Sequence, residues 1–482
     1  MQILSKNLSV CLENLKKRLP SDDVKFHQFK IGKKQDAVLI FIDSLTDKNS
    51  FSKSVIKPLS LYDGSITFNN VKSAIFSPEI KEIADDKTLL GEILGGNGVV
   101  IIDQINKALS VSFKRFEKRA VIEPPTGVTL KGPREGFVED ITTNLSLIRR
   151  RIKDRRLNVQ FFSVGRYSKT QVALCSIDGV SKRGLTELVA KKLKAIDVDY
   201  VADSSTVAKL ISPKSSTLFK QVGTTEKPDV LVSKIMEGRI CIVVDGSPFV
   251  LTLPYLIIED FHSADDYYGD TFKATAIRSL RLFSVLCAVL LPAFFVSAEL
   301  YHLQLLPLSF LLTIVNSIKG IPLSPSFEMF LTLMIFEILN EASIRMPKYV
   351  GMAVSIVGGL VLGETAVNAG IISAPTLMIV AMSGICLYTV PDMVQTFSIL
   401  RLIFLLTAGS TGGYGIIVFS VIILTYLTSF EPFGTPSLAP FSPLITADQK
   451  DGIFKGFYEE LKFRPKSLNS PNKIRQKVKK QN

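Results

Sequence analysis

The chain contains 482 residues with a formal net charge of +13, and 47% of the residues are hydrophobic. This length accommodates two or three domains, and the five cysteines have no paired or metal-type spacing, which excludes a disulfide-stapled secreted domain and favours a reducing compartment. Charged residues are 21% of the sequence but only ten of the 149 residues from Leu282 to Phe430, and the basic excess lies beside this apolar block, where anionic lipid fits better as a partner than nucleic acid.

Residues 1–122 predict an α/β subdomain. The segment from Met1 to Asn14 carries scattered charge and lacks the apolar stretch of a signal peptide. The apolar periodicity then predicts a helix, two strands, a second helix and a hairpin, at Leu12–Leu19, Lys25–Ile31, Ala37–Asp43, Phe51–Leu61 and Val99–Asp103 with Lys107–Phe113.

Residues 157–260 repeat this layout. Phe29-Lys30-Ile31-Gly32 precedes one apolar strand, and Phe162-Ser163-Val164-Gly165 precedes another. A helix is expected at Arg183–Ala195, and the Asp-Gly-Ser-Pro turn that follows Val244 predicts a second hairpin. We therefore expect two α/β subdomains of related architecture; the alternative is that any two α/β units share this much by chance.

Residues 123–156 join the two subdomains. Prolines and glycines from Glu123 to Gly136 keep the chain extended, and a helix is expected at Phe137–Arg156. Basic residues at its end complement the helix dipole; the alternative is docking on an acidic surface of a neighbouring subunit or on lipid headgroups. The candidate subunit contacts are Arg134, Glu135, Arg149, Arg150 and Arg151.

Residues 276–430 predict an all-α transmembrane domain. A bilayer core of about 30 Å needs about 20 apolar residues per helical crossing, and backbone amides in hydrocarbon must be bonded within the chain. Four to six crossings are expected, because the last run is long enough to be a hairpin broken between Gly409 and Gly415. The strong runs are Leu282–Ala298, Tyr349–Val367, Ile371–Val390 and Leu402–Ser429, and the weaker ones are Leu303–Ile318 and Phe327–Ile344.

Flanking charges predict the topology. Arg278 with Arg281, Arg345 with Lys348, and the basic C-terminal tail at residues 431–482 favour the cytoplasmic side. Two of the three apolar stretches before Arg345 then cross, and the third is re-entrant or interfacial. The large N-terminal region is accordingly expected in the cytosol.

Three ionisable residues lie inside a weak apolar run. Glu337, Glu341 and Arg345 are spaced by four residues and share one helix face. Such residues are costly in a membrane and usually face a bundle interior or a water-filled cavity. They form either an internal Glu341–Arg345 ion pair near the membrane surface, or a cation path or subunit contact.

Small residues mark the next run. Ser355, Gly359 and Gly363 line one face, and Glu364 is the only charge there. Small residues at this spacing indicate close helix packing or, as the alternative, a ring of faces around a narrow pore.

Motifs for catalysis are not found. The glycines from Gly91 to Gly98 are not followed by Lys-Ser or Lys-Thr, so they do not form a phosphate loop. His27, His262 and His302 lack metal-ligand spacing, and no nucleophile elbow occurs. The sequence therefore indicates no enzyme activity, cofactor or metal site.

Five further segments form a distinctive combination because of their sequences and their order along the chain. The first is Gly132-Pro133-Arg134-Glu135-Gly136-Phe137-Val138-Glu139, which runs on to the three arginines from Arg149. The others are Ser263-Ala264-Asp265-Asp266-Tyr267-Tyr268, Phe336-Glu337-Ile338-Leu339-Asn340-Glu341-Ala342, Ser355-Ile356-Val357-Gly358-Gly359, and Phe433-Gly434 with Pro436.

Together these segments resemble the GerA family of spore germination proteins, the A subunits of germinant receptors. The resemblance covers roughly Glu123–Pro443, and before Glu123 only the layout is shared. One departure is Asp270, where family members tend to carry a basic residue.

The resemblance implies an integral protein of the spore inner membrane that acts with a transporter-like B subunit and a lipoprotein C subunit. It further implies a homo-oligomeric ring around an ion-conducting pore, opened when a nutrient binds, mainly in the B subunit. The alternatives are a membrane-anchored scaffold without conductance, and a family relative that assists the release of spore-core solutes.

Overall fold

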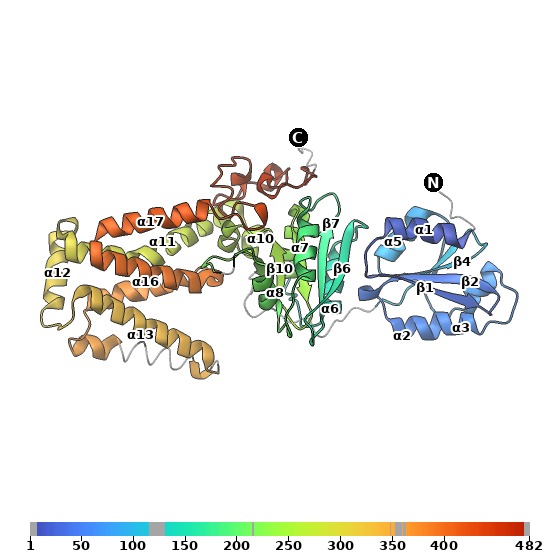
Figure 1. Ribbon diagram of the computed structural model, residues 1–482, viewed down its shortest axis with the longest axis horizontal. Coiled ribbons are helices and arrows are strands. Elements are labelled where there is room, and N and C mark those ends of the chain that lie inside the picture. The colour runs from blue at the N-terminus through green and yellow to red at the C-terminus, as the bar shows by residue number, and fades with distance from the viewer. Residues whose placement is uncertain are drawn as a thin grey trace. The chain divides into compact units, whose positions relative to one another are not determined.

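The computed structural model describes residues 7–114, 131–214, 216–347, 349–351, 359 and 363–476, and the chain forms two compact units. The α/β unit consists of Met1–Tyr255, Pro432–Thr435 and Tyr458–Asn482. The helical unit consists of Leu256–Glu431 and Pro436–Phe457. Figure 1 shows the sheets of the first unit and the helices of the second.

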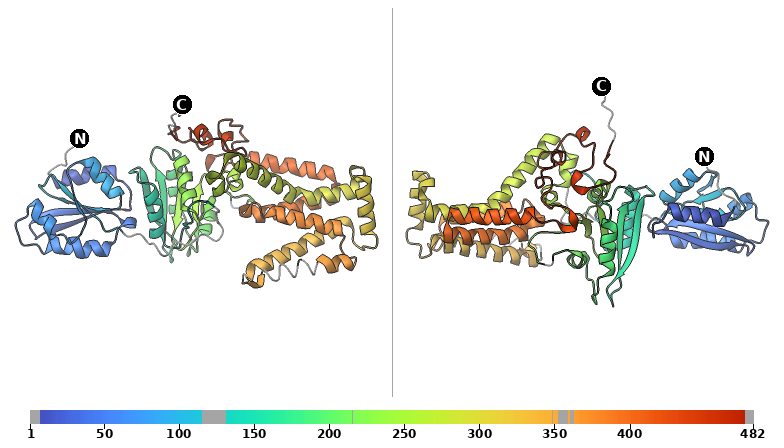
Figure 2. Two further views of the ribbon diagram at one scale, coloured as in Figure 1. Left: turned by 180° about the vertical axis from the view of Figure 1, so that it is seen from behind. Right: turned by 45° about the horizontal axis from the view of Figure 1, so that its top comes forward.

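The first half of the α/β unit is a five-stranded sheet with helices on both faces. Its strand order is β1-β2-β4-β5-β3, and all neighbours run antiparallel. Figures 1 and 2 show α1 and α5 on one face and α2 and α3 on the other. The elements are α1 (Leu8–Arg18), β1 (Val24–Ile31), β2 (Gln35–Ile42), α2 (Lys48–Phe51), η2 (Ser52–Ile56), α3 (Lys57–Ser60), α4 (Phe68–Ala74), β3 (Ile80–Ile83), α5 (Asp86–Leu94), β4 (Gly98–Ile102) and β5 (Ala108–Val111).

The second half repeats the first. Its sheet has the equivalent order, β6-β7-β9-β10-β8, again with antiparallel neighbours. The predicted pair of related α/β subdomains is therefore confirmed. The elements are α6 (Ile141–Arg151), β6 (Leu157–Val164), β7 (Thr170–Ile177), α7 (Leu185–Lys194), α8 (Ser204–Ile211), β8 (Gly223–Thr225), α9 (Pro228–Glu237), β9 (Ile240–Val244) and β10 (Val250–Leu253).

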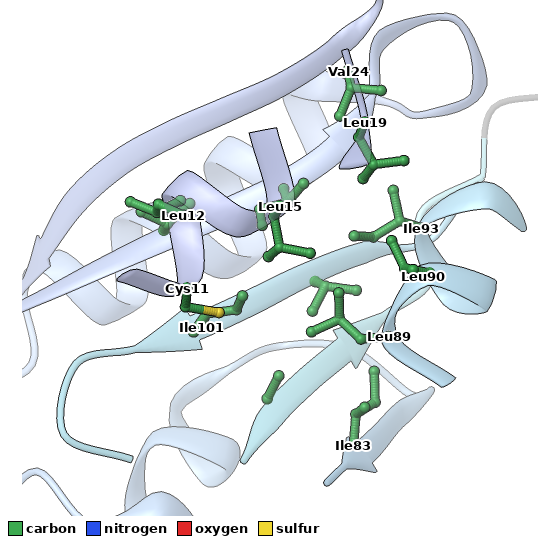
Figure 3. Close-up of a cluster of buried hydrophobic side chains, with 14 of the residues drawn as sticks. Cys11, Leu12, Leu15, Leu19, Val24, Ile83, Leu89, Leu90, Ile93 and Ile101 are labelled. Carbon is green, nitrogen blue, oxygen red and sulfur yellow. The ribbon is translucent and has the colours of Figure 1, made fainter. Parts of the chain in front are cut away.

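The apolar run of β2 explains why helices cover both faces of its sheet. Successive side chains of a strand point to opposite faces; Val38 and Ile40 pack in the layer that contains α1, and Leu39 packs in the opposite layer. Figure 3 shows the first layer, in which Leu12 and Leu15 of α1 lie among the buried side chains. Fully burying one such aliphatic side chain contributes about 1.5–3 kcal/mol, so each sheet is stable only when both faces are covered.

The helix after the linker is shorter than predicted. We expected Phe137–Arg156, but α6 begins at Ile141 because the Asp140 side chain accepts a hydrogen bond from the Thr143 amide and caps the helix. Phe137 is instead buried in the hydrophobic core beside α6. Most of the predicted extended stretch, residues 123–130, lies outside the described residues.

In the helical unit, two described helical segments are long and apolar enough to span a membrane, Thr271–Tyr301 and Pro391–Thr411. A third long helix, α13, carries four ionisable side chains. The helix α12 has 11 residues and is about 16 Å long, too short to cross a bilayer. The elements are α10 (Ala264–Tyr268), α11 (Thr271–Tyr301), α12 (Leu308–Ile318), α13 (Pro325–Arg345), α15 (Ala374–Leu387), η5 (Pro391–Met393), α16 (Val394–Thr411) and α17 (Gly413–Thr428).

A helical hairpin is formed by α16 and α17, and it turns within the predicted break. Gly412 separates the two helices with a φ of +65°, which favours glycine, and a Cβ there would lie 2.9 Å from the Tyr301 ring. The rings of Phe404 in α16 and Phe419 in α17 pack edge to face with centroids 4.8 Å apart. The long run Leu402–Ser429 therefore belongs to two helices.

Candidate functional site

Arg401 connects four helices inside the helical unit. Its side chain is 0% exposed, and its Nη2 forms an ion pair with Glu337 of α13. Its Nη1 donates to the Ser383 hydroxyl of α15 over 2.9 Å, and that hydroxyl donates to the Ala288 carbonyl of α11 over 2.7 Å. A buried charge that loses its partner destabilises a protein by about 3–5 kcal/mol, so this network fixes how α11, α13, α15 and α16 pack.

Close helix contact surrounds the network. The Phe336 ring of α13 lies 6.0 Å from the Arg401 guanidinium carbon and also contacts α15 at Gly384, where a Cβ would collide with the ring. Glycine at that position lets the two helices approach. Charge pairing and small-residue packing therefore occur at the same place.

A second polar contact lies at the beginning of α13. Glu328 is 1% exposed, and its Oε1 accepts hydrogen bonds of 2.7 Å from both the amide and the hydroxyl of Ser373. Ser373 is the N-cap of α15. This contact ties the first turns of α13 and α15 together.

Glu337, Glu341 and Arg345, which the sequence places on one face of α13, do not form a single cluster. Glu337 pairs with Arg401, as described above. Arg345 donates from Nε to Glu341 over 2.7 Å, and the two side chains are 78% and 60% exposed. The Glu341–Arg345 ion pair, one of the two alternatives that the sequence left open, is thus present and lies on the surface of the helical unit.

Gly359 and Gly363 differ in their surroundings. A Cβ on Gly363 would lie 3.2 Å from Leu377 of α15, so this glycine packs against a neighbouring helix. Gly359 is exposed, and a Cβ there would meet none of the described residues within 4 Å. Glu364 is also exposed, and Ser355 lies outside the described residues.

In the α/β unit, Arg149 is separated from the other candidate contacts. It is 2% exposed and donates from Nε and Nη2 to Asp23, over 2.8 and 2.7 Å. Arg150 and Arg151 both pair with Glu135, and Arg134 is exposed. The basic run is therefore not one continuous surface.

A third charged cluster lies where the chain enters α11. Asp266 of α10 accepts hydrogen bonds from Arg278 and Arg281, and Arg278 also reaches Asp451 over 2.9 Å. Burial opposes ionisation of Asp266, but the hydrogen bonds from Arg281 and the Ser263 amide hold its pKa below the ordinary value. The distinctive acidic segment before α11 thus holds the first turns of this helix and the chain after α17 together.

Nearby, His262 stays neutral over a wide pH range. Its Nε2 donates to the Gly452 carbonyl over 2.9 Å. The Tyr267 hydroxyl lies 3.3 Å from Nδ1 and donates to Asp451 over 3.1 Å. Burial and the positive charge of Arg278 lower the pKa of His262 to about 4.

Sequence reasoning missed Arg401, Ser383 and Glu328. The predicted run begins at Leu402 and leaves out Arg401, although apolar residues flank this arginine on both sides. Glu328 stands next to Phe327, at the edge of a weak run. A search for single charges within apolar segments, independent of mutual spacing, would have found both.

The fold and this site define a protein with a repeated α/β unit and a helical unit whose internal charges suit a membrane-embedded bundle. The chain matches the family described as Bacillus/Clostridium GerA spore germination protein over residues 11–467. It belongs to this GerA family.

Relatives cover nearly the whole chain. Spore germination protein KA of Bacillus subtilis (strain 168) is 35% identical, over 98% of this chain and 89% of the relative. Spore germination protein A1 of the same organism is 31% identical, over 98% and 97%. A third relative from that organism, uncharacterized membrane protein YfkQ, is 30% identical over 97% and 93%.

A solved structure is also similar. It is the crystal structure of the N-terminal domain of the A subunit of the Bacillus megaterium spore germinant receptor GerK3. The identity is 27% and the TM-score 0.40, with 53% of this chain and 98% of that chain covered.

Proposed function

We propose that this protein is the A subunit of a spore germinant receptor and that its helical unit forms the ion-conducting pore of a nutrient-gated complex in the spore inner membrane. The names of its relatives support the receptor role, and its apolar helices support the membrane location. The α/β unit then lies in the cytosol, and the partners are a transporter-like B subunit and a lipoprotein C subunit.

One observation carries the pore proposal: charges lie on the outside of an apolar bundle. Glu341 and Arg345 are 60% and 78% exposed, and Glu364 and the open position Gly359 are exposed as well. Charged side chains in membrane segments are costly unless they face protein or water. A second copy of the chain or an aqueous passage would satisfy these charges, and a ring of copies around a pore provides both.

The α/β unit supplies further candidates for contacts in such a ring. Arg134 is exposed, and the cluster of Glu135 with Arg150 and Arg151 is partly exposed. We propose these residues as contacts between neighbouring subunits. Arg149 forms a buried ion pair with Asp23 of its own chain, so its contribution to a subunit contact is indirect.

The decisive experiment compares two glycines. Purified protein is reconstituted in liposomes, alone and with its B and C subunits, and monovalent-cation flux and the amount of assembled ring are measured together. Gly359→Leu is expected to reduce flux with normal assembly, because a Cβ there has none of the described residues within 4 Å. Gly363→Leu is the matched control and is expected to reduce assembly, because Leu377 occupies that space.

The alternatives predict other results. A scaffold without conductance would leave flux independent of Gly359, and a relative that assists solute release would pass spore-core solutes but show no cation flux. Normal flux and normal assembly in Gly359→Leu would contradict the pore proposal.

A further inference from the structure

The C-terminal tail contains a short β-hairpin that presents two exposed apolar side chains. Its two arms are residues 462–464 and 473–475, which together are the tail hairpin. Phe463 and Ile474 lie opposite each other in an antiparallel bridge, and backbone hydrogen bonds of 2.9 and 2.8 Å join the residues on either side of them. In such a non-hydrogen-bonded pair the two side chains lie close together on one face. They are 66% and 49% exposed, so they form one apolar surface.

The opposite face of the tail hairpin is attached to the second α/β repeat. Successive side chains of a strand point to opposite faces, and Arg464 Nε donates to the Met236 carbonyl over 2.6 Å. Arg475 pairs with Glu237 over 3.4 Å. Both partners lie at the C-terminal end of α9, where positive charge is favourable. Between the two arms, Leu468 is 0% exposed. The tail hairpin is therefore fixed on its repeat, with its apolar pair turned outward.

The charge around this pair indicates the chemistry of its partner. Eight of the 22 residues from Leu461 to Asn482 are Lys or Arg, and none is Asp or Glu; two acidic residues, Glu459 and Glu460, stand before the hairpin. Lys462 and Lys473 flank the apolar pair in the chain, and both are exposed. The matching surface is therefore anionic and also accepts apolar side chains.

A phospholipid bilayer has both properties. Anionic headgroups attract clusters of lysine and arginine, and aromatic and aliphatic side chains insert at the boundary between headgroups and acyl chains. The tail hairpin also begins five residues after Phe457, the last residue of the helical unit. This continuity favours a membrane over nucleic acid or an acidic protein.

We propose that the tail hairpin docks on an anionic phospholipid surface, with Phe463 and Ile474 inserted among the headgroups and Lys462 and Lys473 beside the phosphates. The inference rests on the proposed membrane location of the helical unit. It adds a lipid contact of the α/β unit, outside the apolar helices.

The test uses tryptophan fluorescence, because the chain contains no tryptophan. Full-length Phe463→Trp is placed in nanodiscs of phosphatidylcholine, with or without phosphatidylglycerol. In the anionic nanodiscs its emission is expected to shift to shorter wavelength and to be quenched by brominated phospholipid, and in the neutral nanodiscs both effects are expected to be weak. Ile474→Trp, on the other arm, is expected to behave alike. Phe76→Trp, at a position of the first repeat that is 71% exposed, is the control and is expected to show neither effect.

The contribution of charge is tested in the Phe463→Trp background. Each lysine near an anionic surface contributes about fivefold to membrane affinity, so Lys462→Gln with Lys473→Gln is expected to lower the ratio of docked to free hairpin by about tenfold or more. Most of the quenching is then lost. Lys33→Gln with Lys34→Gln is the matched control; it removes the same charge from an exposed turn between β1 and β2 and is expected to leave quenching unchanged.

Other results would overturn the proposal. Absence of quenching in anionic nanodiscs would do so, as would equal quenching in neutral nanodiscs or in the Lys462→Gln, Lys473→Gln variant, since docking would then not depend on charge. A shift to shorter wavelength that needs the B and C subunits and is not accompanied by quenching would assign this surface to a protein partner and reject the lipid.

Two measurements on the same preparations separate this proposal from the proposed function. Co-elution with lipid tests the membrane location, and a chain that enters neither kind of nanodisc would reject both the location and the docking. Incorporation and normal cation flux without quenching would keep the pore and reject the docking. Quenching that depends on Lys462 and Lys473 without any flux would keep the docking and reject the pore.

Discussion

Arg149 and Asp23 form a buried ion pair that joins the two α/β repeats. The Asp23 carboxylate also accepts a hydrogen bond from Ser21 over 2.6 Å. Next to this pair, Ser21 Oγ accepts from the Val159 amide and the Asp22 amide donates to the Val159 carbonyl. The chain before β1 thus pairs with the otherwise open edge of β6, and the ion pair holds it there.

Arg149→Ala is therefore expected to separate the repeats. Removal of one partner from a buried pair costs about 3–5 kcal/mol, and the loss should appear as faster hydrogen exchange at the Val159 amide. Arg150→Ala is the control; this side chain is 39% exposed, and its substitution is expected to cost at most about 1 kcal/mol. Equal exchange in the two variants would show that the ion pair does not hold the β6 edge.

The strands could be predicted because their alternation is local. The predicted Ala37–Asp43 agrees with β2 to within two residues, since buried apolar side chains occupy both faces of that strand. The edge strands β3 and β8 were missed, because four and three residues are too few to show a period.

The pairing in the helical unit could not be predicted from spacing alone. Glu337 was grouped with Glu341 and Arg345, because residues four apart share a helix face. Its partner, Arg401, is 64 residues further along the chain and comes from a helix whose packing the sequence does not encode locally. The same holds for Ser383, whose role depends on facing Arg401 and the Ala288 carbonyl.

The second prediction concerns Arg401. Arg401→Met leaves Glu337 and Ser383 without their partner, so we expect the assembled protein to become less stable by about 3–5 kcal/mol, measured as resistance to unfolding in mixed detergent micelles. Arg345→Met removes an exposed ion pair and is expected to cost at most about 1 kcal/mol.

A double variant sharpens that test. If the Arg401–Glu337 pair acts as a unit, Arg401→Met with Glu337→Gln is less destabilised than the sum of the two single variants. Additive effects would mean that the two side chains act independently.

The third prediction is a pH dependence around His262. In the unfolded chain a histidine has a pKa of about 6.5, whereas in the folded protein the pKa is about 4. Between these values the unfolded state binds more protons, so stability falls as the pH falls from about 6.5 to about 4. The charged groups that face this ring are Arg278, Asp451 and Asp266.

His262→Asn removes the titrating group and is expected to flatten the stability profile over that pH range. His27→Asn, at an exposed position of β1, is the control and is expected to leave the profile as in the wild type. Proteolysis of the segment around Gly452 at pH 5 and pH 7 measures the effect, and cleavage that is equally slow at both pH values in the wild type would disprove the assignment.

The last prediction concerns Phe433, four residues after Ser429, the residue that caps the end of α17. Phe433 is 6% exposed and packs in the hydrophobic layer of the second repeat, with Lys192 Nζ 5.5 Å from its ring centroid. Lys182 Nζ donates to the carbonyls of Phe433 and Gly434 and to the Thr435 hydroxyl, the last over 2.9 Å. The chain that leaves the last apolar helix is thus anchored in the α/β unit.

Phe433→Ala is expected to weaken this anchor, because truncating a buried phenylalanine costs about 3–5 kcal/mol. We expect faster hydrogen exchange at the Thr435 amide and slower nutrient-triggered ion release, at normal receptor abundance. Phe454→Ala, at a position that is 68% exposed, is the control and should change neither quantity. Rapid exchange at Thr435 together with normal ion release would show that this contact has no role in ion release. Lys182→Met removes the other side of the contact and is expected to have both effects of Phe433→Ala.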